Sequence, residues 1–335
     1  RTSLPLWVSF FLLATILSAL INAVPLMQLI VGSKNLIFLW SIFFLIAWGA
    51  ISPELMDALW KRITWIVFFQ LPILLYQYWV IVPSRSGLDG VSWDAVVGGF
   101  GGDPLAGGAS GTLAFFLVVS LLYFTALIKR NLISTTNYFL LVCLITYCLV
   151  MAEVKVIVLL IPVGMAVLFS SSLLKKPIRT ILGFILITTV LISILISYEY
   201  QKNKIRNSTK NVFDLSYIVD RSFGYSFSGS EVNLDRRKMG RVTTLIHWWN
   251  ENGFNDPLHT VFGYGPGASR AQSDFYIGGI TKKYQVNLNT SAMSQLLWEV
   301  GLLGTTLLII IILRAFLTSY VKSKSKKLSH SMQAY

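Results

Sequence analysis

Long apolar runs dominate the chain and constrain its fold more than any other feature. A helix needs about 20 apolar residues to cross a lipid bilayer. The runs that approach this length are Leu4–Ala23, Leu36–Ile51, Ile63–Val82, Thr112–Ile128, Leu132–Met151, Val154–Leu174, Ile181–Tyr198 and Ser291–Thr318. Only 13% of the 335 residues are charged, whereas soluble domains have about 25%. The sequence therefore predicts an all-α polytopic membrane protein with about eight transmembrane helices.

Short basic segments recur on one side of this topology. They are Trp60–Arg62, Lys129–Asn131, Lys175–Arg179 and Val321–Lys327. The positive-inside rule makes that side the cytoplasm. It also accounts for the net charge of +13, so we expect no nucleic-acid partner. The first residue is Arg1 rather than Met, as expected of a fragment whose earlier spans are missing.

The predicted topology divides the chain into four parts. Residues 1–198 hold transmembrane helices 1–7 with short loops, residues 199–290 form one large external loop, residues 291–318 form the eighth helix, and residues 319–335 are a basic cytoplasmic tail. Loops longer than about 12–15 residues are usually functional or disordered. The external loop is rich in aromatic residues, which predicts a small, partly helical, folded cap rather than disorder.

The external loop also carries twelve basic and eight acidic residues. An anionic ligand at the outer surface of the membrane would explain this excess of positive charge. The alternative is an ordinary solvated surface, because long loops are translocated regardless of their charge.

The segment Asp235–Gly253 of this loop is predicted to be a helix. Apolar residues recur at helical spacing and would form its buried face: Val242, Leu245, Ile246 and Trp249. Gly253 is placed to end the helix in a left-handed conformation. A neighbouring face would carry Arg237, Arg241, Thr244 and Trp248.

This second face suits a phosphorylated sugar. Guanidinium groups bind phosphate oxygens in a bidentate manner, and a Trp ring stacks on sugars or cations. If Gly240 starts the helix instead, Arg241 lies in its first turn, where the helix N-terminus itself attracts phosphate. The alternative is a surface helix with a solvated basic edge.

The order of several short motifs resembles the O-antigen ligase and polymerase superfamily. The matching positions are Gly240-Arg241, Trp248, Asp256-Pro257-Leu258, the glycine turn Gly263–Gly267, Gln295, Glu299 and Gly301–Gly304. Upstream, Asp94–Gly102 (DAVVGGFGG) is similar to an outer loop of polysaccharide polymerases, and Ala152–Pro162 to the start of one of their spans. The resemblance covers about Asp94 to Gly304.

One position departs from the family pattern. The family's His-Asn pair falls on Thr290-Ser291 in this chain, so the histidine proposed as the base of the ligases is absent there. The resemblance therefore favours a polymerase of O-antigen, capsular or exopolysaccharide type over a ligase that transfers glycan to lipid A-core. A non-enzymatic transporter of lipid-linked sugars is the rival class, although the chain has no internal repeat of the kind that transporters often show.

The resemblance implies a glycosyltransferase in the bacterial inner membrane, with its active loop facing the periplasm or the outside. The donor would be an undecaprenyl-diphosphate-linked glycan, and membrane lipid and a chain-length regulator are further candidate partners. Arg241 is the leading phosphate ligand and Arg221 the second, while Arg237 and Arg270 could equally be rim charges. Trp248, Tyr264, Lys155 and Thr290 complete the predicted substrate-binding set.

The base that would deprotonate the acceptor hydroxyl is left open. His247 and Glu153 are the candidates, against a structural imidazole for His247 and an interfacial ion pair for Glu153 with Lys155. His259 and His330 have no obvious partners in the sequence. No spacing of His or Cys indicates a metal site, and we expect no cofactor.

Overall fold

The chain divides into two compact units in the computed structural model. The first unit comprises Arg1–Ser52 and Ser216–Leu328, and the second comprises Pro53–Leu215 and Ser329–Tyr335. The structure describes residues 3–84, 96–103, 107–108, 110–152, 154, 157–169, 178, 181–182, 185, 189, 239–272 and 276–323. Within these residues the chain is mostly helical, with almost no strand.

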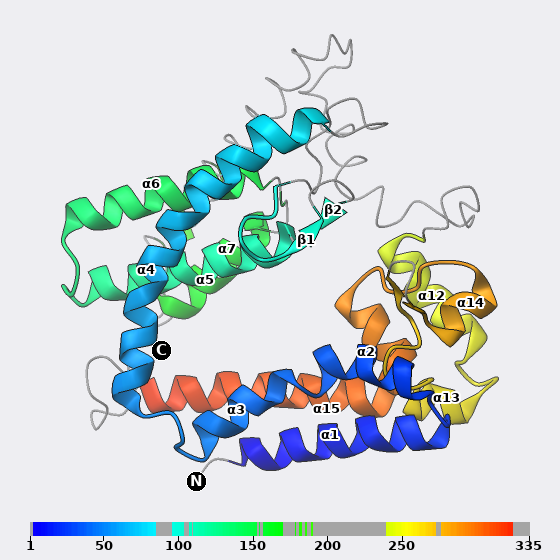
Figure 1. Ribbon diagram of the computed structural model, residues 1–335. Coiled ribbons are helices and arrows are strands. Elements are labelled where there is room, and N and C mark those ends of the chain that lie inside the picture. The colour runs from blue at the N-terminus through cyan, green and yellow to red at the C-terminus, as the bar shows by residue number, and fades with distance from the viewer. Residues whose placement is uncertain are drawn as a thin grey trace. The chain divides into compact units, whose positions relative to one another are not determined.

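Figure 1 shows the elements of both units. The first unit contains α1 (Leu4–Ile21), α2 (Leu26–Leu36), α3 (Leu39–Ala47), α12 (Arg241–Glu251), α13 (Pro257–Phe262), β3 (Ala271–Gln272), β4 (Tyr276–Ile277), α14 (Gly279–Tyr284) and α15 (Ala292–Ser323). The second unit contains α4 (Pro53–Tyr76), the π-helix η1 (Gln77–Ile81), the 3-10 turn η2 (Val82–Ser84), β1 (Gly102–Asp103), β2 (Gly107–Gly108), α5 (Ser110–Lys129), α6 (Thr135–Met151) and α7 (Ile157–Leu168). The pairs β1–β2 and β3–β4 are both antiparallel.

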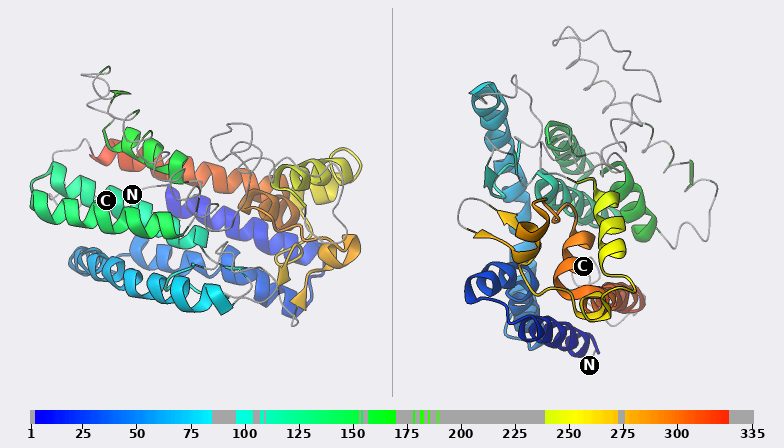
Figure 2. Two further views of the ribbon diagram at one scale, coloured as in Figure 1. Left: turned by 90° about the horizontal axis from the view of Figure 1, so that it is seen from above. Right: turned by 90° about the vertical axis from the view of Figure 1, so that its right-hand side faces the viewer.

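In the first unit, α1 and α15 lie side by side (Figure 2). Their contact buries Val8 and Phe11 of α1 together with Val300 and Ile311 of α15. The opposite flanks of both helices expose Leu, Ile and Phe side chains. An apolar helix that buries one flank and exposes equally apolar residues on the other is typical of a membrane span.

The helix α2 occupies the stretch between the first two predicted spans, where the sequence analysis expected only a short loop. The predicted second span, Leu36–Ile51, is a shorter helix, α3, which follows α2 at a bend of 48°. Gly32 of α2 lies so close to the glycine turn that a Cβ there would be 2.3 Å from the carbonyl carbon of Pro266. The apolar run did not reveal this contact, because the partner of α2 lies more than two hundred residues away.

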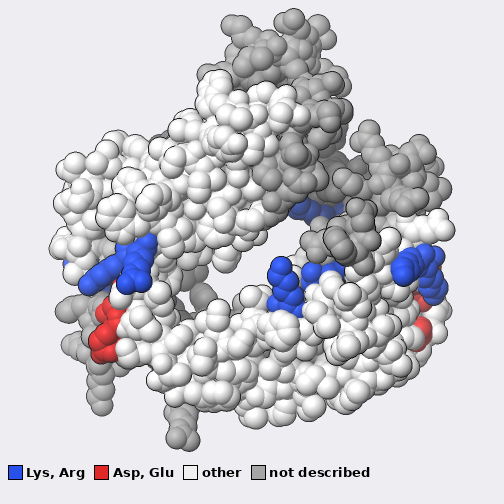
Figure 3. Space-filling model, in the orientation of Figure 1, with Lys and Arg blue, Asp and Glu red and all other residues white. Residues whose placement is uncertain are grey.

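Four described helical stretches are long and apolar enough to cross a membrane: Leu4–Ile21, Glu54–Ser84, Ser110–Lys129 and Ala292–Thr318. The bent pair α2–α3 makes a fifth if it is one span. Figure 3 agrees, since most of the described surface in that view carries neither acidic nor basic side chains. The chain is therefore a membrane protein. Eight spans are not confirmed, because α6 has 17 residues and α7 has 12, and most of the predicted span Ile181–Tyr198 lies outside the described residues.

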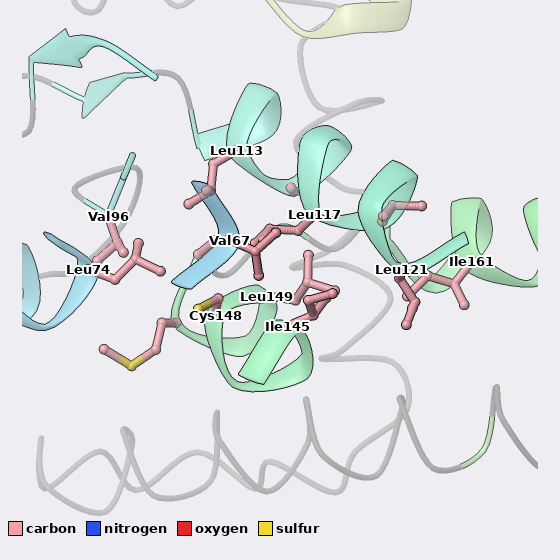
Figure 4. Close-up of a cluster of buried hydrophobic side chains, with 14 of the residues drawn as sticks. Val67, Leu74, Val96, Leu113, Leu117, Leu121, Ile145, Cys148, Leu149 and Ile161 are labelled. Carbon is pink, nitrogen blue, oxygen red and sulfur yellow. The ribbon is translucent and has the colours of Figure 1, made fainter. Parts of the chain in front are cut away.

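The core of the second unit is formed by α4, α5, α6 and α7 (Figure 4). Fully buried residues meet from each helix, among them Leu74, Leu117, Ile145, Leu149 and Ile161.

Two buried glutamines of the same unit face a glycine-containing loop. The Gln77 side chain accepts hydrogen bonds from the backbone N–H groups of Val97 (2.9 Å) and Gly98 (2.8 Å) and donates one to the carbonyl O of Gly98 (3.0 Å).

The second glutamine, Gln70, accepts a hydrogen bond from the N–H of Gly99 at 2.8 Å. Burying a polar side chain in an apolar helix is costly unless it finds partners, and here the loop backbone supplies them. Gly98 has φ +63°, a conformation that favours glycine. This loop is the described part of the Asp94–Gly102 motif; Asp94 lies outside the described residues.

Candidate functional site

A glycine turn, Gly263–Gly267, packs against a break in α15. The break is at Gly301, whose φ is +64°. It frees the carbonyl oxygens of Trp298 and Glu299, which accept hydrogen bonds at 2.9 Å from the N–H groups of Tyr264 and Gly265. A Cβ on Gly263 would lie 2.6 Å from the backbone N of Gly301. Glycine is therefore needed on both sides of this contact.

The side chain of Glu299 fixes the end of the glycine turn from inside. It is completely buried and accepts hydrogen bonds from Ser269 Oγ (2.8 Å), Gln295 Nε2 (3.3 Å) and the backbone of Gly267. Arg270 Nε lies 3.8 Å from Glu299 Oε1. A buried carboxylate needs such partners because removing its hydration is expensive.

Arg270 is thus an interior residue and not the rim charge that the sequence allowed. Only 4% of it is exposed. Its Nε and Nη2 atoms make no hydrogen bond to any described residue, although Nε is the atom paired with Glu299. The position of Arg270 was not predictable from its own neighbours, because Glu299 is distant in the sequence.

The predicted helix around Arg241 is present as α12. Gly240 is its extended N-cap and provides no side-chain cap, so Arg241 is the first helical residue, and it is exposed. Gly253, with φ +25°, follows the end of the helix as expected. The first turn of an uncapped helix presents N–H groups without intrahelical partners, and a guanidinium beside them adds a full positive charge.

The buried face of α12 is not the predicted one. Thr244 and Trp248 are buried, whereas Ile246 is 55% and Trp249 is 48% exposed. The hydroxyl of Thr244 donates to the carbonyl O of Gly240 (2.8 Å) and shares a hydrogen bond with Thr290 Oγ1 (3.0 Å). The start of α12 and the position where the family has its histidine are therefore neighbours in space.

His247 packs as an aromatic core residue. Its ring is 4.9 Å from that of Tyr284 and 5.8 Å from that of Trp298. Its Nε2 is buried, with no hydrogen-bond partner among the described residues. Burial lowers the pKa of His247, although the charge of Glu251 raises it. This packing resembles that of a structural imidazole, and the role of His247 as a base stays a prediction.

A histidine with two partners lies elsewhere, at His259 of α13. Its Nδ1 is 2.5 Å from Asp256 Oδ2, and its Nε2 is 3.0 Å from Asn22 Oδ1. Asp256 also caps α13, because its side chain accepts a hydrogen bond from the N–H of His259. The sequence analysis found no partner for His259. An N-cap Asp three residues before a His is a local signal that could have revealed one.

Tyr264 links this histidine to the end of α12. Its ring stacks on His259, with the centroids 3.9 Å apart, and its hydroxyl donates to Asn252 Oδ1 at 2.7 Å. Burial, followed by the charges of Asp256 and Glu251, raises the pKa of Tyr264 to about 12. One face of the ring is thus occupied by imidazole, which leaves less of it for the predicted contact with a sugar.

Other predicted site residues lie outside the described residues. They are Glu153, Lys155, Arg221 and Arg237. Within the described ranges, no three His, Cys, Asp or Glu side chains come together as metal ligands would. Among the predicted residues that are described, Arg241, His247 and Trp248 belong to α12 and Thr290 contacts it. Tyr264 lies within the glycine turn, and Arg270 follows it.

Comparison with known proteins assigns no family. The chain matches no protein-family model, and no curated protein or solved structure is significantly similar to it. The resemblance to the O-antigen ligase and polymerase superfamily therefore stays a prediction.

Proposed function

We propose that this membrane protein is a glycosyltransferase that polymerises undecaprenyl-diphosphate-linked oligosaccharide repeat units into O-antigen, capsular polysaccharide or exopolysaccharide. The proposal places it in the bacterial inner membrane, with α12 on the outer face. The observation that carries it is the start of α12, where exposed Arg241 stands at a helix N-terminus without a side-chain cap.

A diphosphate leaving group gains negative charge as the glycosidic bond to it breaks. Donors fixed in advance around the place where that charge develops lower the barrier. Arg241 would supply a guanidinium, and the first N–H groups of α12 would supply further donors. Such a site requires neither a metal nor a cofactor.

The acceptor hydroxyl must lose a proton to a base, a contribution worth about 10²–10⁴-fold. His247 and Glu153 remain the candidates. His259 is a weaker choice, because both of its ring nitrogens already face Asp256 and Asn22. Thr290, bonded to Thr244 near Arg241, contributes a hydroxyl where the family has its histidine.

Two other functions are open to the same chain. A ligase would pass the glycan to lipid A-core, and a transporter would move the lipid-linked sugar without reacting it. No observation on the described residues favours either over the polymerase.

Purified protein in nanodiscs with an undecaprenyl-diphosphate-linked repeat unit would test the proposal. We expect a ladder of longer carrier-linked chains on a gel, abolished by Arg241→Ala and by Arg241→Lys because lysine lacks the planar fork. The matched control is Lys282→Ala, which removes an exposed cation of α14 in the same unit and should leave the ladder unchanged. Wild-type chain length in Arg241→Ala would overturn the role of this residue. Transfer only to lipid A-core would identify a ligase, and carrier movement without transfer a transporter.

A further inference from the structure

The glycine turn lies at the end of one candidate span, α1, and at the break inside another, α15. Asn22, directly after α1, donates from Nδ2 to the carbonyl O of Gly263 at 3.0 Å, and Ser18 Oγ donates to the carbonyl O of Glu299 at 3.0 Å. The end of α1 and the break of α15 at Gly301 therefore lie at the same level. Helix α1 has 18 residues, about 27 Å at 1.5 Å per residue, and 301–318 of α15 is of similar length.

Two apolar stretches of this length each approach the thickness of the hydrocarbon layer, about 30 Å. They pack side by side, so a membrane that contains both has one of its boundaries near Asn22, Gly263 and Gly301. This boundary follows from the lengths and contacts of the two helices and needs no assumption about the chemistry of the protein.

Helix α13 is fixed at this boundary from both sides. The carbonyl O of Val261 is 2.4 Å from where a Cβ on Gly301 would lie. At the other side, His259 Nε2 faces Asn22 Oδ1 at 3.0 Å. Helix α13 therefore cannot lie far out in the water above the spans.

Large apolar side chains are exposed on α13, on α12 and on the turn between them. We call them the outer apolar patch: Ile246, Trp249, Phe254, Leu258 and Val261. Phe254 is 89% exposed, and its ring lies 5.6 Å from that of Trp249, which links the turn to α12. Ile246 and Trp249 are three residues apart on one helix, and Leu258 and Val261 on the other, so each pair shares a face.

We propose that the outer apolar patch inserts into the interfacial layer of the membrane beside α1 and α15. Contiguous exposed apolar residues usually mark a contact surface, and Trp and Phe favour the membrane interface. Helix α13, which carries part of the patch, contacts both spans, and Ile21 of α1 and Leu302 of α15, near the same boundary, are also exposed. Lipid is therefore its occupant, and α12 lies on the membrane rather than above it.

The polar side of α12 fits this orientation. Glu251, at its end, is exposed, and its carboxylate accepts a hydrogen bond from the Tyr284 hydroxyl at 2.7 Å. The helix thus has a protein-facing side with Thr244 and Trp248, an apolar side with Ile246 and Trp249, and a polar end. An amphipathic helix lying in a membrane surface has this division.

Site-directed spin labelling in nanodiscs tests the proposal independently of any enzymatic activity. Cys143 is replaced in Cys143→Ser, whereas buried Cys148 does not react with the label. Single cysteines then carry a nitroxide in Phe254→Cys and Leu258→Cys, with Glu251→Cys, on the face of α12 opposite Ile246, and Asn255→Cys as exposed polar neighbours. Accessibility to oxygen, which concentrates in lipid, is compared with accessibility to a water-soluble nickel chelate.

We expect the labels at 254 and 258 to be more accessible to oxygen than to nickel, with the opposite order at 251 and 255. Two results would overturn the proposal. Equal nickel accessibility at all four sites would place the patch in water, and shielding of 254 and 258 from both reagents would identify a protein partner, such as a second copy. Phe254 is exposed and its ring lies against that of Trp249, so its replacement should leave the core intact. Should labelling at 254 disturb the fold, Ile246→Cys provides the same comparison.

Discussion

Each unit holds a glycine-containing loop against an apolar helix, but by different means. In the first unit α15 breaks at Gly301, so the turn Gly263–Gly267 pairs with freed backbone carbonyls and with the carboxylate of Glu299. In the second unit the helical segment carries Gln70 and Gln77, whose neutral amides bind the loop Val97–Gly99. The first arrangement depends on buried charge and on a broken helix, and the second depends on neither.

The largest expected effects come from removing the side chain that holds each loop. Glu299→Ala leaves Arg270 buried without its partner, which typically destabilises a protein by about 3–5 kcal/mol. The matched change in the second unit, Gln77→Ala, leaves two N–H groups without acceptors, at about 1–3 kcal/mol each, so a loss of similar size is expected there from neutral groups. Hydrogen exchange of peptides covering 261–269 and 96–101 would measure each loop separately, together with the melting temperature.

The double variant Glu299→Gln/Arg270→Met supplies the control. It removes both charges while keeping volume, so it should be more stable than Glu299→Ala. If Glu299→Ala and the double variant were equally destabilised, Glu299 would not act by compensating the charge of Arg270. The contrast between the two units would then be lost.

A smaller effect is expected from adding one methyl group to each loop. Gly263→Ala would place its Cβ within 2.7 Å of three backbone atoms of α15, which cannot move aside. Gly98→Ala would meet the end of the Gln70 side chain at 2.4 Å, which can rotate away. Both positions have positive φ, which costs about 1–3 kcal/mol, so Gly263→Ala should lower the melting temperature more.

Gly111→Ala is the matched control for both. A Cβ there meets nothing within 4 Å, and Ala is favoured over Gly in a helix by about 1 kcal/mol. Equal decreases in melting temperature for Gly263→Ala and Gly98→Ala would mean that positive φ alone determines the loss of stability. The close approach of the turn to α15 would then be unimportant.

Much of the fold was predictable because apolar length is a local property. The helices α1, α5 and α15 begin and end within a few residues of the predicted runs. Helix α2 was missed, because its contact with Pro266 through Gly32 is a long-range one. The end of α12 was predictable from Gly253, since glycine marks helix ends through its own backbone preferences. The start at Arg241 matches the alternative prediction, in which Gly240 begins the helix.

The buried face of α12 and the partners of the site were less predictable. Apolar periodicity predicts that a face avoids water but does not distinguish protein from lipid, so Ile246 and Trp249 were assigned to the core, where Thr244 and Trp248 lie instead. The burial of Arg270 depends on Glu299, a pairing that no local pattern contains. His259 is the exception, because its partner Asp256 is only three residues away.

The smallest expected effect concerns the pair Asp256 and His259. It tests whether charge contributes to the stability of the first unit, in contrast to the neutral amides that hold the loop of the second unit. Burial raises the pKa of the Asp256 carboxyl, but the hydrogen bonds and charge of His259, with the charge of Lys283, lower it more, so it lies below its usual value. A carboxyl with a depressed folded-state pKa stabilises the fold at pH values above its unfolded pKa of about 3.9, and this contribution disappears as the pH falls through the folded value.

Asp256→Asn keeps the N-cap acceptor and removes the charge. Because 37% of the Asp256 side chain is exposed, solvent screens the pair, and we expect a loss below about 1 kcal/mol. The melting temperatures of wild type and variant should differ between pH 5 and pH 7, and the difference should shrink as the pH falls from about 4 through the folded pKa of Asp256. In a His259→Gln background the same substitution should change little, because the imidazole that lowers the pKa is gone. A difference that persists at low pH would show that Asp256 acts as an uncharged cap, and the first unit would then owe its pH dependence to other groups.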